Sequence, residues 1–221
     1  MLEFAITFKP DMSPERIVNF IPTQLKLDTF NGDAWLSIAP FHMSIRARGL
    51  PVLPGYGAVP ELNCRTYVTV DGKPGIYFFS LDIASSAATW GARTFYHLPY
   101  FHAQMKITRQ HDSIAYSSSR GAAKWAAKYT PNTAMQSAEP RSLNHWLTER
   151  YCLYTVWRGH AYRGNIHHVP WPLNDVSVKI EQNTMTNLIN NDALQGPDLA
   201  SYARELEVLI WPLERVRSES T

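Results

Sequence analysis

Short runs of alternating polar and apolar residues, joined by tight-turn dipeptides, constrain the fold of this chain most. Asn31-Gly32, Asp71-Gly72 and Arg158-Gly159 each separate two such runs. Glycine and asparagine tolerate a positive φ, which the tight turns of β-hairpins require. The sequence therefore predicts a mostly antiparallel sheet built from hairpins.

The predicted strands are rich in β-branched and aromatic residues and are bounded by turn-forming residues. They cover residues 4–9, 24–30, 34–38, 61–70, 75–81, 100–108, 113–118, 124–129, 151–157, 161–168, 176–180 and 204–210. Short helices are expected at residues 14–21, 84–96, 142–150 and 184–189, with Ser13 and Ser142 as suitable N-caps for two of them. Residues 49–60 are rich in Pro and Gly and should form a loop.

A length of 221 residues suits one β domain, and no repeat, low-complexity tract or linker divides the chain. We expect a single domain over residues 1–221, with its core at 4–216 and a polar tail at 217–221. Closing the sheet would remove its exposed edges. We therefore predict a mainly β (α+β) fold, namely a closed, mostly antiparallel β-barrel with a few short helices.

Several functional classes receive no support. The net charge is only +2 and basic residues are not clustered, which argues against nucleic-acid binding. No signal peptide and no apolar run of the ~20 residues that span a bilayer is found, so we expect a cytoplasmic protein without a membrane partner. Cys64 and Cys152 lack a CxxC partner, and HExxH and nucleotide-binding motifs are absent. We therefore expect neither a metal nor a cofactor.

The run from residue 61 to residue 70 carries an unusual polar face. Period-two alternation places Glu61, Asn63, Arg65 and Tyr67 on one side of a strand. A solvated outer face would explain this pattern, and so would a polar barrel lumen. In a lumen, Arg65 would bind a ligand carboxylate through two parallel hydrogen bonds.

The run after Pro99 repeats this design, with Tyr100, His102, Gln104 and Lys106 on one face. Two such strands would line one polar cavity if both faces point into the barrel. The alternative for Lys106 is an exposed strand lysine near the barrel rim.

Glu149 and Arg150 stand where a predicted helix meets a strand. A structural ion pair or a helix cap would explain them. If either group is buried it needs a partner, and Glu149 would then orient Arg65 or carry a proton. Arg150 is a further candidate for ligand binding.

Several stretches together resemble the YqjF-like family of uncharacterised bacterial proteins. They are residues 27–32 (LDTFNG), 60–68 (PELNCRTYV), 78–82 (FFSLD), 98–100 (LPY), 147–154 (LTERYCLY) and 168–173 (HVPWPL). That family is similar to the acetoacetate decarboxylase-like superfamily. The resemblance implies a closed β-barrel with an internal ligand cavity, and it places Glu61 and Arg65 in the region of the superfamily's site glutamate and arginine.

The resemblance does not extend to the catalytic step of the decarboxylase. There, a Lys-Lys pair follows a proline, and one lysine forms a Schiff base with the keto acid. The nearest matching proline here, Pro99, is followed by Tyr100 and Phe101, neither of which forms an imine. Acetoacetate decarboxylation is therefore not expected, and whether the chain is an enzyme stays open.

We predict a barrel that binds a small, partly apolar carboxylic acid or carbonyl compound, with Arg65 holding the anionic end. Glu61, Asn63, Tyr100 and His102 would supply hydrogen bonds or a proton, and the apolar walls would be Tyr67, Tyr96 and Trp171. One alternative is an imine-forming lyase or decarboxylase that uses Lys106. The other is a non-catalytic scaffold or interaction protein, and the sequence leaves a homo-oligomer open.

Overall fold

The computed structural model describes residues 2–8, 14–44, 59–189 and 197–216. Its strands are β1 (Leu2–Phe8), β2 (Lys26–Leu27), β3 (Leu36–Met43), β4 (Val59–Val70), β5 (Lys73–Ile83), β6 (Tyr100–His102), β7 (Gln104–Gln110), β8 (Ser113–Arg120), β9 (Ala123–Ser137), β10 (Cys152–Trp157), β11 (His160–His167), β12 (Pro172–Asn183), β13 (Leu199–Ala203) and β14 (Leu209–Arg215). The helices are α1 (Pro14–Ile17), α2 (Ser86–Tyr96) and α3 (Leu143–Thr148), with the 3-10 helices η1 (Val18–Phe20) and η2 (Met185–Ile189). The predicted mainly β fold is confirmed.

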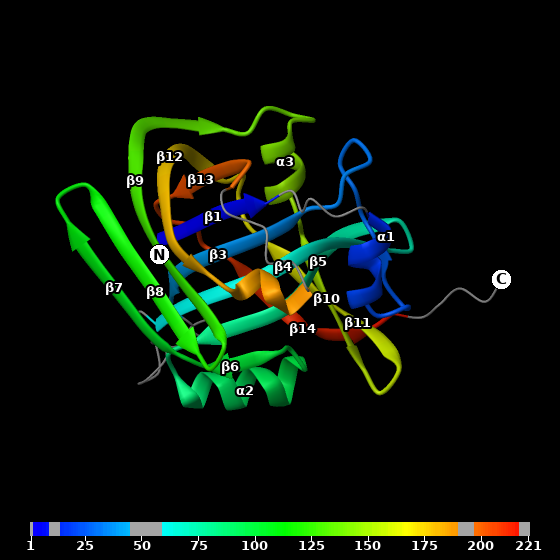
Figure 1. Ribbon diagram of the computed structural model, residues 1–221. Coiled ribbons are helices and arrows are strands. Elements are labelled where there is room, and N and C mark those ends of the chain that lie inside the picture. The colour runs from blue at the N-terminus through cyan, green and yellow to red at the C-terminus, as the bar shows by residue number, and fades with distance from the viewer. Residues whose placement is uncertain (1, 9–13, 45–58, 190–196, 217–221) are drawn as a thin grey trace.

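The strands form one open sheet, so the predicted closure into a barrel is wrong. The order is β14-β11-β10-β5-β4-β3-β1-β13-β12-β9-β8-β7, with β2 and β6 paired beside it. Within the described part of the chain, β14 and β7 are the ends of this path and do not pair with each other. The sheet instead folds over itself, because two register shifts between β12 and β9 bend this pair of long strands (Figure 1).

Folding over creates a packed layer on one face of β4. Leu62 and Cys64 point to this side and belong to the same buried cluster as Tyr116 of β8 and Trp125 of β9. We call this side the packed face. Large rings fill it, because Tyr116 is 1% exposed and Trp125 is fully buried. The β7–β8–β9 arm therefore buries its apolar side against the centre of the sheet rather than closing a ring.

The opposite side of β4 carries Glu61, Asn63, Arg65 and Tyr67, and we call it the polar face. Tyr67 belongs to a second buried cluster that also contacts Leu199 of β13 and Leu213 of β14. β13 and β14 are separated in the sheet by β1, β3, β4, β5, β10 and β11. The sheet therefore curls around the polar face, while α2 and α3 add Ala88 and Leu147 to the same cluster.

A β-bulge keeps apolar residues of β5 on the polar-face side. The register between β4 and β5 shifts between Cys64 and Arg65. As a result, Ile76 and Phe78 on one side of the shift and Leu81 and Ile83 on the other all join the cluster at the polar face. Strict alternation would have sent one of these two pairs to the packed face.

The helix starts and two of the tight turns lie at or close to the positions that the sequence predicts. The side chains of Ser85 and Ser142 cap α2 and α3 by accepting a hydrogen bond from the third residue after each. The turns Asp71-Gly72 and Arg158-Gly159 take positive φ angles and join β4 to β5 and β10 to β11, as predicted. The predicted helix over residues 184–189 is the 3-10 helix η2.

The predicted hairpin at Asn31-Gly32 is only partly correct. Both residues have positive φ, and Phe30 and Asp33 form an isolated bridge across the turn. However, the preceding strand β2 pairs with β4 rather than with β3. The backbone N–H of Asp28 also donates to the carbonyl of Tyr67, which continues the pairing with β4 and prevents a hairpin with β3.

Two other predicted strands are divided differently in the structure. Residues 100–108 form β6, which pairs in parallel with β5, and β7, which pairs with β8. Residues 204–210 were expected to be the last strand, but β13 ends at Ala203 and β14 begins at Leu209. The predicted loop at 49–60 lies mostly outside the described residues. Within the described ranges, no helix is long and apolar enough to cross a membrane.

Candidate functional site

The polar face of β4 is buried, so the interpretation as a solvated outer face is wrong. Glu61 is 2% exposed, Asn63 is 3% exposed and Arg65 is 6% exposed. The curled sheet and the flanking helices remove these groups from water. Since a buried charge requires an opposite charge or hydrogen bonds, each buried polar atom on this face needs a partner.

Part of the polar face is hydrogen-bonded internally. The Tyr100 hydroxyl, brought in by β6, donates to Glu61 Oε2 at 3.0 Å. Burial, and then the negative charge of Glu61, raise the pKa of Tyr100 well above its usual range, so the phenol stays protonated and acts as the donor. Further along β4, the Tyr67 and Ser37 hydroxyls lie 2.5 Å apart.

Within the described part of the chain, three other polar atoms on this side of the sheet are buried without a hydrogen-bond partner. They are Arg65 Nε, Asn63 Oδ1 and Trp35 Nε1. Trp35 lies in the apolar cluster at the polar face, and Arg65 is paired in register with Ser37 of β3. Within the described residues, no carboxylate forms an ion pair with Arg65. A guanidinium and an indole N–H are donors suited to a carboxylate or carbonyl oxygen.

The remaining predicted residues are only partly brought together here. Tyr96, at the end of α2, packs against the apolar cluster at the polar face. His102, at the end of β6, and Lys106, on β7, are both exposed. β6 pairs with β5, whereas β7 pairs with β8. Trp171 packs in a different cluster with Leu173, Ala203 and Leu206. Tyr100 is thus the one member of the second predicted polar face that the structure brings to Glu61.

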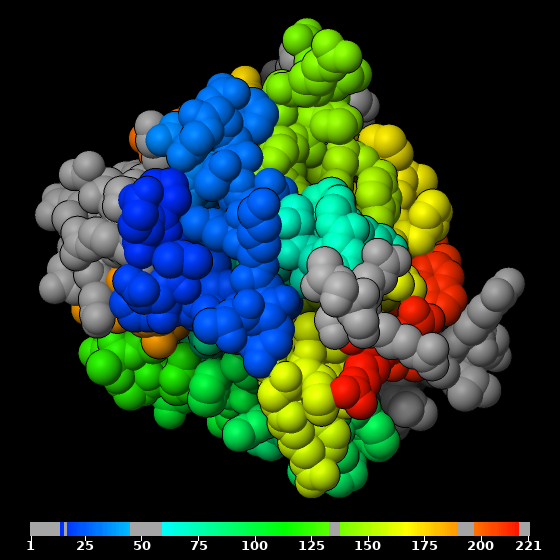
Figure 2. Space-filling view, turned by 90° about the vertical axis from the view of Figure 1, so that its right-hand side faces the viewer, coloured from blue at the N-terminus to red at the C-terminus, as the bar shows by residue number. Residues whose placement is uncertain are grey.

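Glu149 and Arg150 lie elsewhere, at a pocket on the surface shown in Figure 2. There, the segment before β3, the β4–β5 turn and α3 meet. The pocket has a volume of about 340 Å³ and is lined by Asp28, Thr69, Gly72, Pro74, His145, Trp146, Glu149 and Arg150. Within the described residues Glu149 does not pair with Arg65, as it would have to in order to orient it; its Oε2 instead accepts a hydrogen bond from the Tyr151 hydroxyl.

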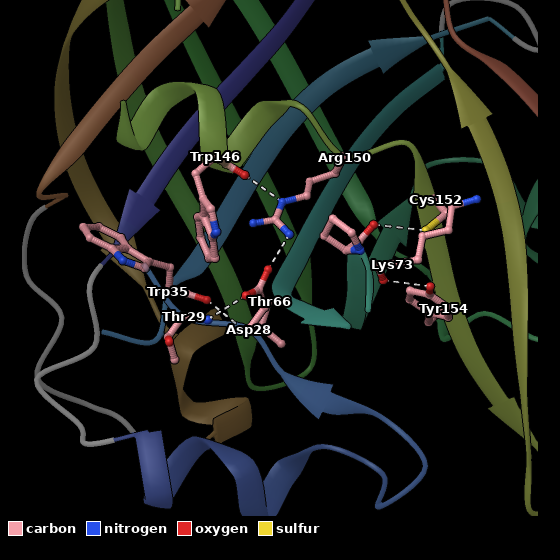
Figure 3. Close-up of polar contacts among 10 residues, drawn as sticks. Asp28, Thr29, Trp35, Thr66, Lys73, Trp146, Arg150, Cys152 and Tyr154 are labelled. Carbon is pink, nitrogen blue, oxygen red and sulfur yellow. Dashed lines mark hydrogen bonds and ion pairs between the residues drawn. The ribbon is translucent and has the colours of Figure 1, made fainter. Parts of the chain in front are cut away.

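Arg150, one of these lining residues, is held by two hydrogen bonds and a ring contact (Figure 3). Its Nη1 donates to Asp28 Oδ2 at 2.6 Å, and its Nε donates to the carbonyl of Trp146 at 2.6 Å. The guanidinium also lies 4.1 Å from the centre of the Trp146 ring. Its Nη2 is buried and has no hydrogen-bond partner.

Sequence reasoning missed two acids that form partly buried ion pairs. Asp28 pairs with Arg150, and Asp82 pairs with Arg120 at 2.9 Å. Asp82 also accepts hydrogen bonds from Ser80 and Ser118, and all three lie on the packed face. Asp82 stands alone as an acid within the apolar run from residue 76 to residue 83. This position could have indicated an ion pair, since an acid is rarely buried unless it is paired. Among the described residues, no group of three or more His, Cys, Asp or Glu side chains is placed to hold a metal ion.

Comparison with known sequences shows to which family this chain belongs. A family model matches residues 8–207; it is DUF2071, described as an uncharacterized conserved protein. The chain belongs to this family. It is 50% identical over 199 residues to the "Uncharacterized protein YqjF" of Bacillus subtilis (strain 168), a match that covers 88% of this chain and 82% of that protein. The resemblance to the YqjF-like family is thereby confirmed.

Solved structures with the same fold belong to acetoacetate decarboxylase-like proteins. The acetoacetate decarboxylase of Legionella pneumophila matches with a TM-score of 0.65 and 14% identity, covering 98% of this chain and 85% of that one. The enduracididine biosynthesis enzyme MppR, complexed with pyruvate, matches with a TM-score of 0.69 and 10% identity, covering 99% and 89%. Identities this low show a shared fold and nothing further.

Proposed function

We propose that this protein binds a small, partly apolar carboxylic acid or carbonyl compound at the polar face of β4. One observation carries this proposal: Arg65 is 6% exposed, and its Nε has no hydrogen-bond partner. The unpartnered Asn63 Oδ1 and Trp35 Nε1 lie on the same side of the sheet. Their hydrogen-bonding capacity is unused within the described residues.

The energetics favour an anionic or carbonyl ligand. Removing a charged side chain from water costs several kcal/mol, roughly, unless an opposite charge or hydrogen bonds compensate. A carboxylate supplies both, and it accepts two parallel hydrogen bonds from a guanidinium. The ligand's apolar part would contact the surrounding cluster, which includes Leu81, Ile83 and Leu153.

Glu61 and Tyr100 provide a proton-handling pair beside the proposed anchor. The Tyr100 phenol already donates to the Glu61 carboxylate, so the two groups form a connected donor and acceptor. In a bound carbonyl compound, such a pair polarises an oxygen or exchanges a proton. MppR, a protein of the same fold, is recorded in complex with pyruvate, a keto acid, which is consistent with this ligand class.

Imine chemistry at Lys106 has less physical support than ligand binding. Lys106 is exposed on β7, and no lysine in the described residues is fully buried. A Schiff-base lysine needs a desolvated site or a neighbouring cation to be neutral at pH 7. Borohydride trapping with pyruvate, followed by mass mapping, tests this alternative, and an adduct on Lys106 would reinstate it.

The direct test is a thermal-shift titration with pyruvate, acetoacetate and isobutyrate. Wild type should gain stability with ligand concentration, as expected for a ligand that binds only the native state. Arg65→Met should weaken binding about ten- to a hundred-fold, the effect of losing a charged hydrogen bond. Arg109→Met, which removes an exposed arginine on β7, is the matched control and should bind like wild type.

Two outcomes would contradict the proposal. If wild type and Arg65→Met respond equally to the same acid, the acid binds at another site. If none of the three compounds stabilises wild type at millimolar concentration, the proposed ligand class is wrong.

A further inference from the structure

Helix α2 turns its large apolar side chains away from the molecule. Trp90 and Phe95 are each 67% exposed, more than any other large apolar side chain in the described residues, and their ring centroids lie 6.2 Å apart. The helix packs on the sheet through small residues instead, since Ala88 and Ala92 join the cluster at the polar face. A single exposed apolar residue is ordinary, but two large rings in contact on one helix form a patch, which is typical of an interaction surface.

The chain around α2 is basic and contains no acid. Residues 83–111 hold two arginines and a lysine but neither Asp nor Glu. Arg93 lies on α2 between the two exposed rings and is itself exposed. Asp82, just before this segment, is fully buried and paired with Arg120, so it adds no negative charge to the surface. The outer side of α2 therefore attracts an anionic partner.

A second segment without acids meets the C-terminal end of α2. Residues 150–174 hold three arginines and neither Asp nor Glu. The Thr155 hydroxyl donates at 2.8 Å to the carbonyl of His97, the C-cap of α2. The His97 ring stacks on Trp157, which is 37% exposed, and the guanidinium of Arg158 lies 4.3 Å from the centre of the Trp157 ring. What we call the α2 surface consists of Trp90, Arg93, Phe95, Trp157 and Arg158.

The charge of the α2 surface argues against a second copy of this chain as its partner. In a symmetric contact, the same patch of both copies would meet, so Arg93 would face an equally basic surface. Like charges oppose such a contact. The helix instead lies at the outer end of the molecule, beyond β6, where a flat layer can reach it (Figure 1).

We propose that the α2 surface binds an anionic lipid bilayer. Arg93 and Arg158 bind the lipid headgroups, and the rings of Trp90 and Phe95 enter the boundary between the headgroups and the acyl chains. Aromatic rings favour this depth, and each basic residue near an anionic leaflet strengthens binding. The expectation of no membrane partner rested on the lack of a spanning run, which a contact with the lipid surface does not require.

The experiment is sedimentation of the full chain with two kinds of vesicle, phosphatidylcholine alone and phosphatidylcholine with an equal amount of phosphatidylserine. Wild type should bind the anionic vesicles at least about ten-fold more tightly than the neutral ones. Combining Trp90→Ala with Phe95→Ala should weaken this binding about ten- to a hundred-fold, because both rings then stay out of the lipid. Arg93→Gln should weaken it about five-fold. Alanine is a strong helix former, and circular dichroism should show that the double variant keeps its fold.

Matched variants and a fluorescence readout separate the α2 surface from general adsorption. Trp211→Ala removes a 45% exposed ring on β14, and Lys179→Gln removes an exposed charge on β12, so both should bind vesicles like wild type. Tryptophan fluorescence should shift to the blue when anionic vesicles are added, because Trp90 leaves water. Trp90→Phe keeps an apolar ring, so it should still bind while showing a smaller shift.

Several results would overturn this inference. Absence of binding to anionic vesicles, equal affinity for neutral vesicles, or full affinity in the double alanine variant would each do so. An unchanged blue shift in Trp90→Phe would show that α2 does not enter the lipid. If light scattering finds a dimer that Phe95→Glu converts to a monomer, the α2 surface is a contact between two copies of the chain instead.

Discussion

The two faces of β4 differ in how completely their buried polar groups are paired. On the packed face, the carboxylate of Asp82 accepts from Arg120, Ser80 and Ser118, and Tyr116 donates to a backbone carbonyl at 2.6 Å. On the polar face, Arg65 Nε and Asn63 Oδ1 are buried without partners. The paired groups come from β5 and β8, whereas Asn63 and Arg65 come from β4, so the difference lies between the two sides of the sheet.

We propose that this difference separates polar groups that stabilise the fold from polar groups that bind a ligand. A fully paired buried network stabilises one arrangement of the chain and excludes water. An unpaired buried donor instead weakens the free protein and persists where something else completes it. Substitution of Asp82 is therefore expected to cost much more stability than substitution of Arg65, and the predictions below test this contrast.

The largest expected effect is on stability, at Asp82. Asp82→Ala removes the shared acceptor of Arg120, Ser80 and Ser118 from a site where Asp82 is fully buried. Breaking a buried ion pair from one side costs about 3–5 kcal/mol, and the 24% exposure of Arg120 favours the lower end, about 3 kcal/mol. Urea denaturation followed by circular dichroism measures this free energy of unfolding.

A double variant provides the control for this prediction. Asp82→Leu combined with Arg120→Met removes both charges, so it should lose less stability than Asp82→Ala alone. If Asp82→Ala costs less than about 1 kcal/mol, Asp82 is not the centre of a stabilising network.

The sequence predicted the polar face because a strand's alternation is a local property. Glu61, Asn63, Arg65 and Tyr67 share a face through period-two geometry alone, and the structure shows that this face is buried. The Ser85 and Ser142 caps and the Asp71-Gly72 turn are also local features. The Ser142 cap and the Asp71-Gly72 turn were predicted correctly for that reason. The Ser85 cap was not predicted, but it lies within two residues of the predicted start of that helix.

The features that were missed depend on contacts between distant parts of the chain. Arg150 pairs with Asp28 across 122 positions, and Arg120 pairs with Asp82 across 38. The open sheet depends on bends in β9 and β12 that no short motif marks. Lys106 and Tyr100 were expected on one face of a single strand. Tyr100 instead lies on β6, which pairs with β5, and Lys106 lies on β7, which pairs with β8. None of these pairings follows from local alternation.

A smaller effect is expected from the thiol on the packed face at alkaline pH. Burial, and then the charge of Asp82, raise the pKa of Cys64 from 9.0 to about 12. The folded state therefore keeps the proton that the unfolded chain releases above pH 9. This contribution to stability is complete below pH 9 and is lost as the pH rises toward 12.

Urea unfolding at pH 8, 9 and 10 measures this loss. Between pH 9 and 10, Cys64→Ala should lose stability less steeply than wild type, by about 1 kcal/mol per pH unit. Cys152→Ala is the matched control, because burial raises the pKa of Cys152 but a hydrogen bond with Tyr154 and the nearby charges of Lys73 and Arg163 oppose that shift. Equal slopes for wild type and Cys64→Ala would show that water reaches the packed face.

The smallest expected change in stability is at Arg65, where the contrast between the faces is sharpest. Without ligand, Arg65→Met should unfold within about 1 kcal/mol of wild type, because an unpartnered guanidinium is replaced by an apolar chain of similar length. Arg150→Met, at an equally buried arginine, should lose about 3 kcal/mol because it leaves Asp28 without its partner. A loss at Arg65 as large as that at Arg150 would mean that Arg65 stabilises the fold.

Adding ligand should then make the free energies of unfolding of wild type and Arg65→Met differ. An acid at about 100 times its Kd stabilises wild type by about 2.7 kcal/mol through mass action, whereas Arg65→Met gains little at the same concentration. The two proteins therefore unfold alike in buffer and differ in the presence of ligand. Asp82→Ala should instead unfold early in both conditions, because its defect lies on the packed face and precedes binding. That pattern would assign the paired side of β4 to stability and its unpaired side to ligand binding.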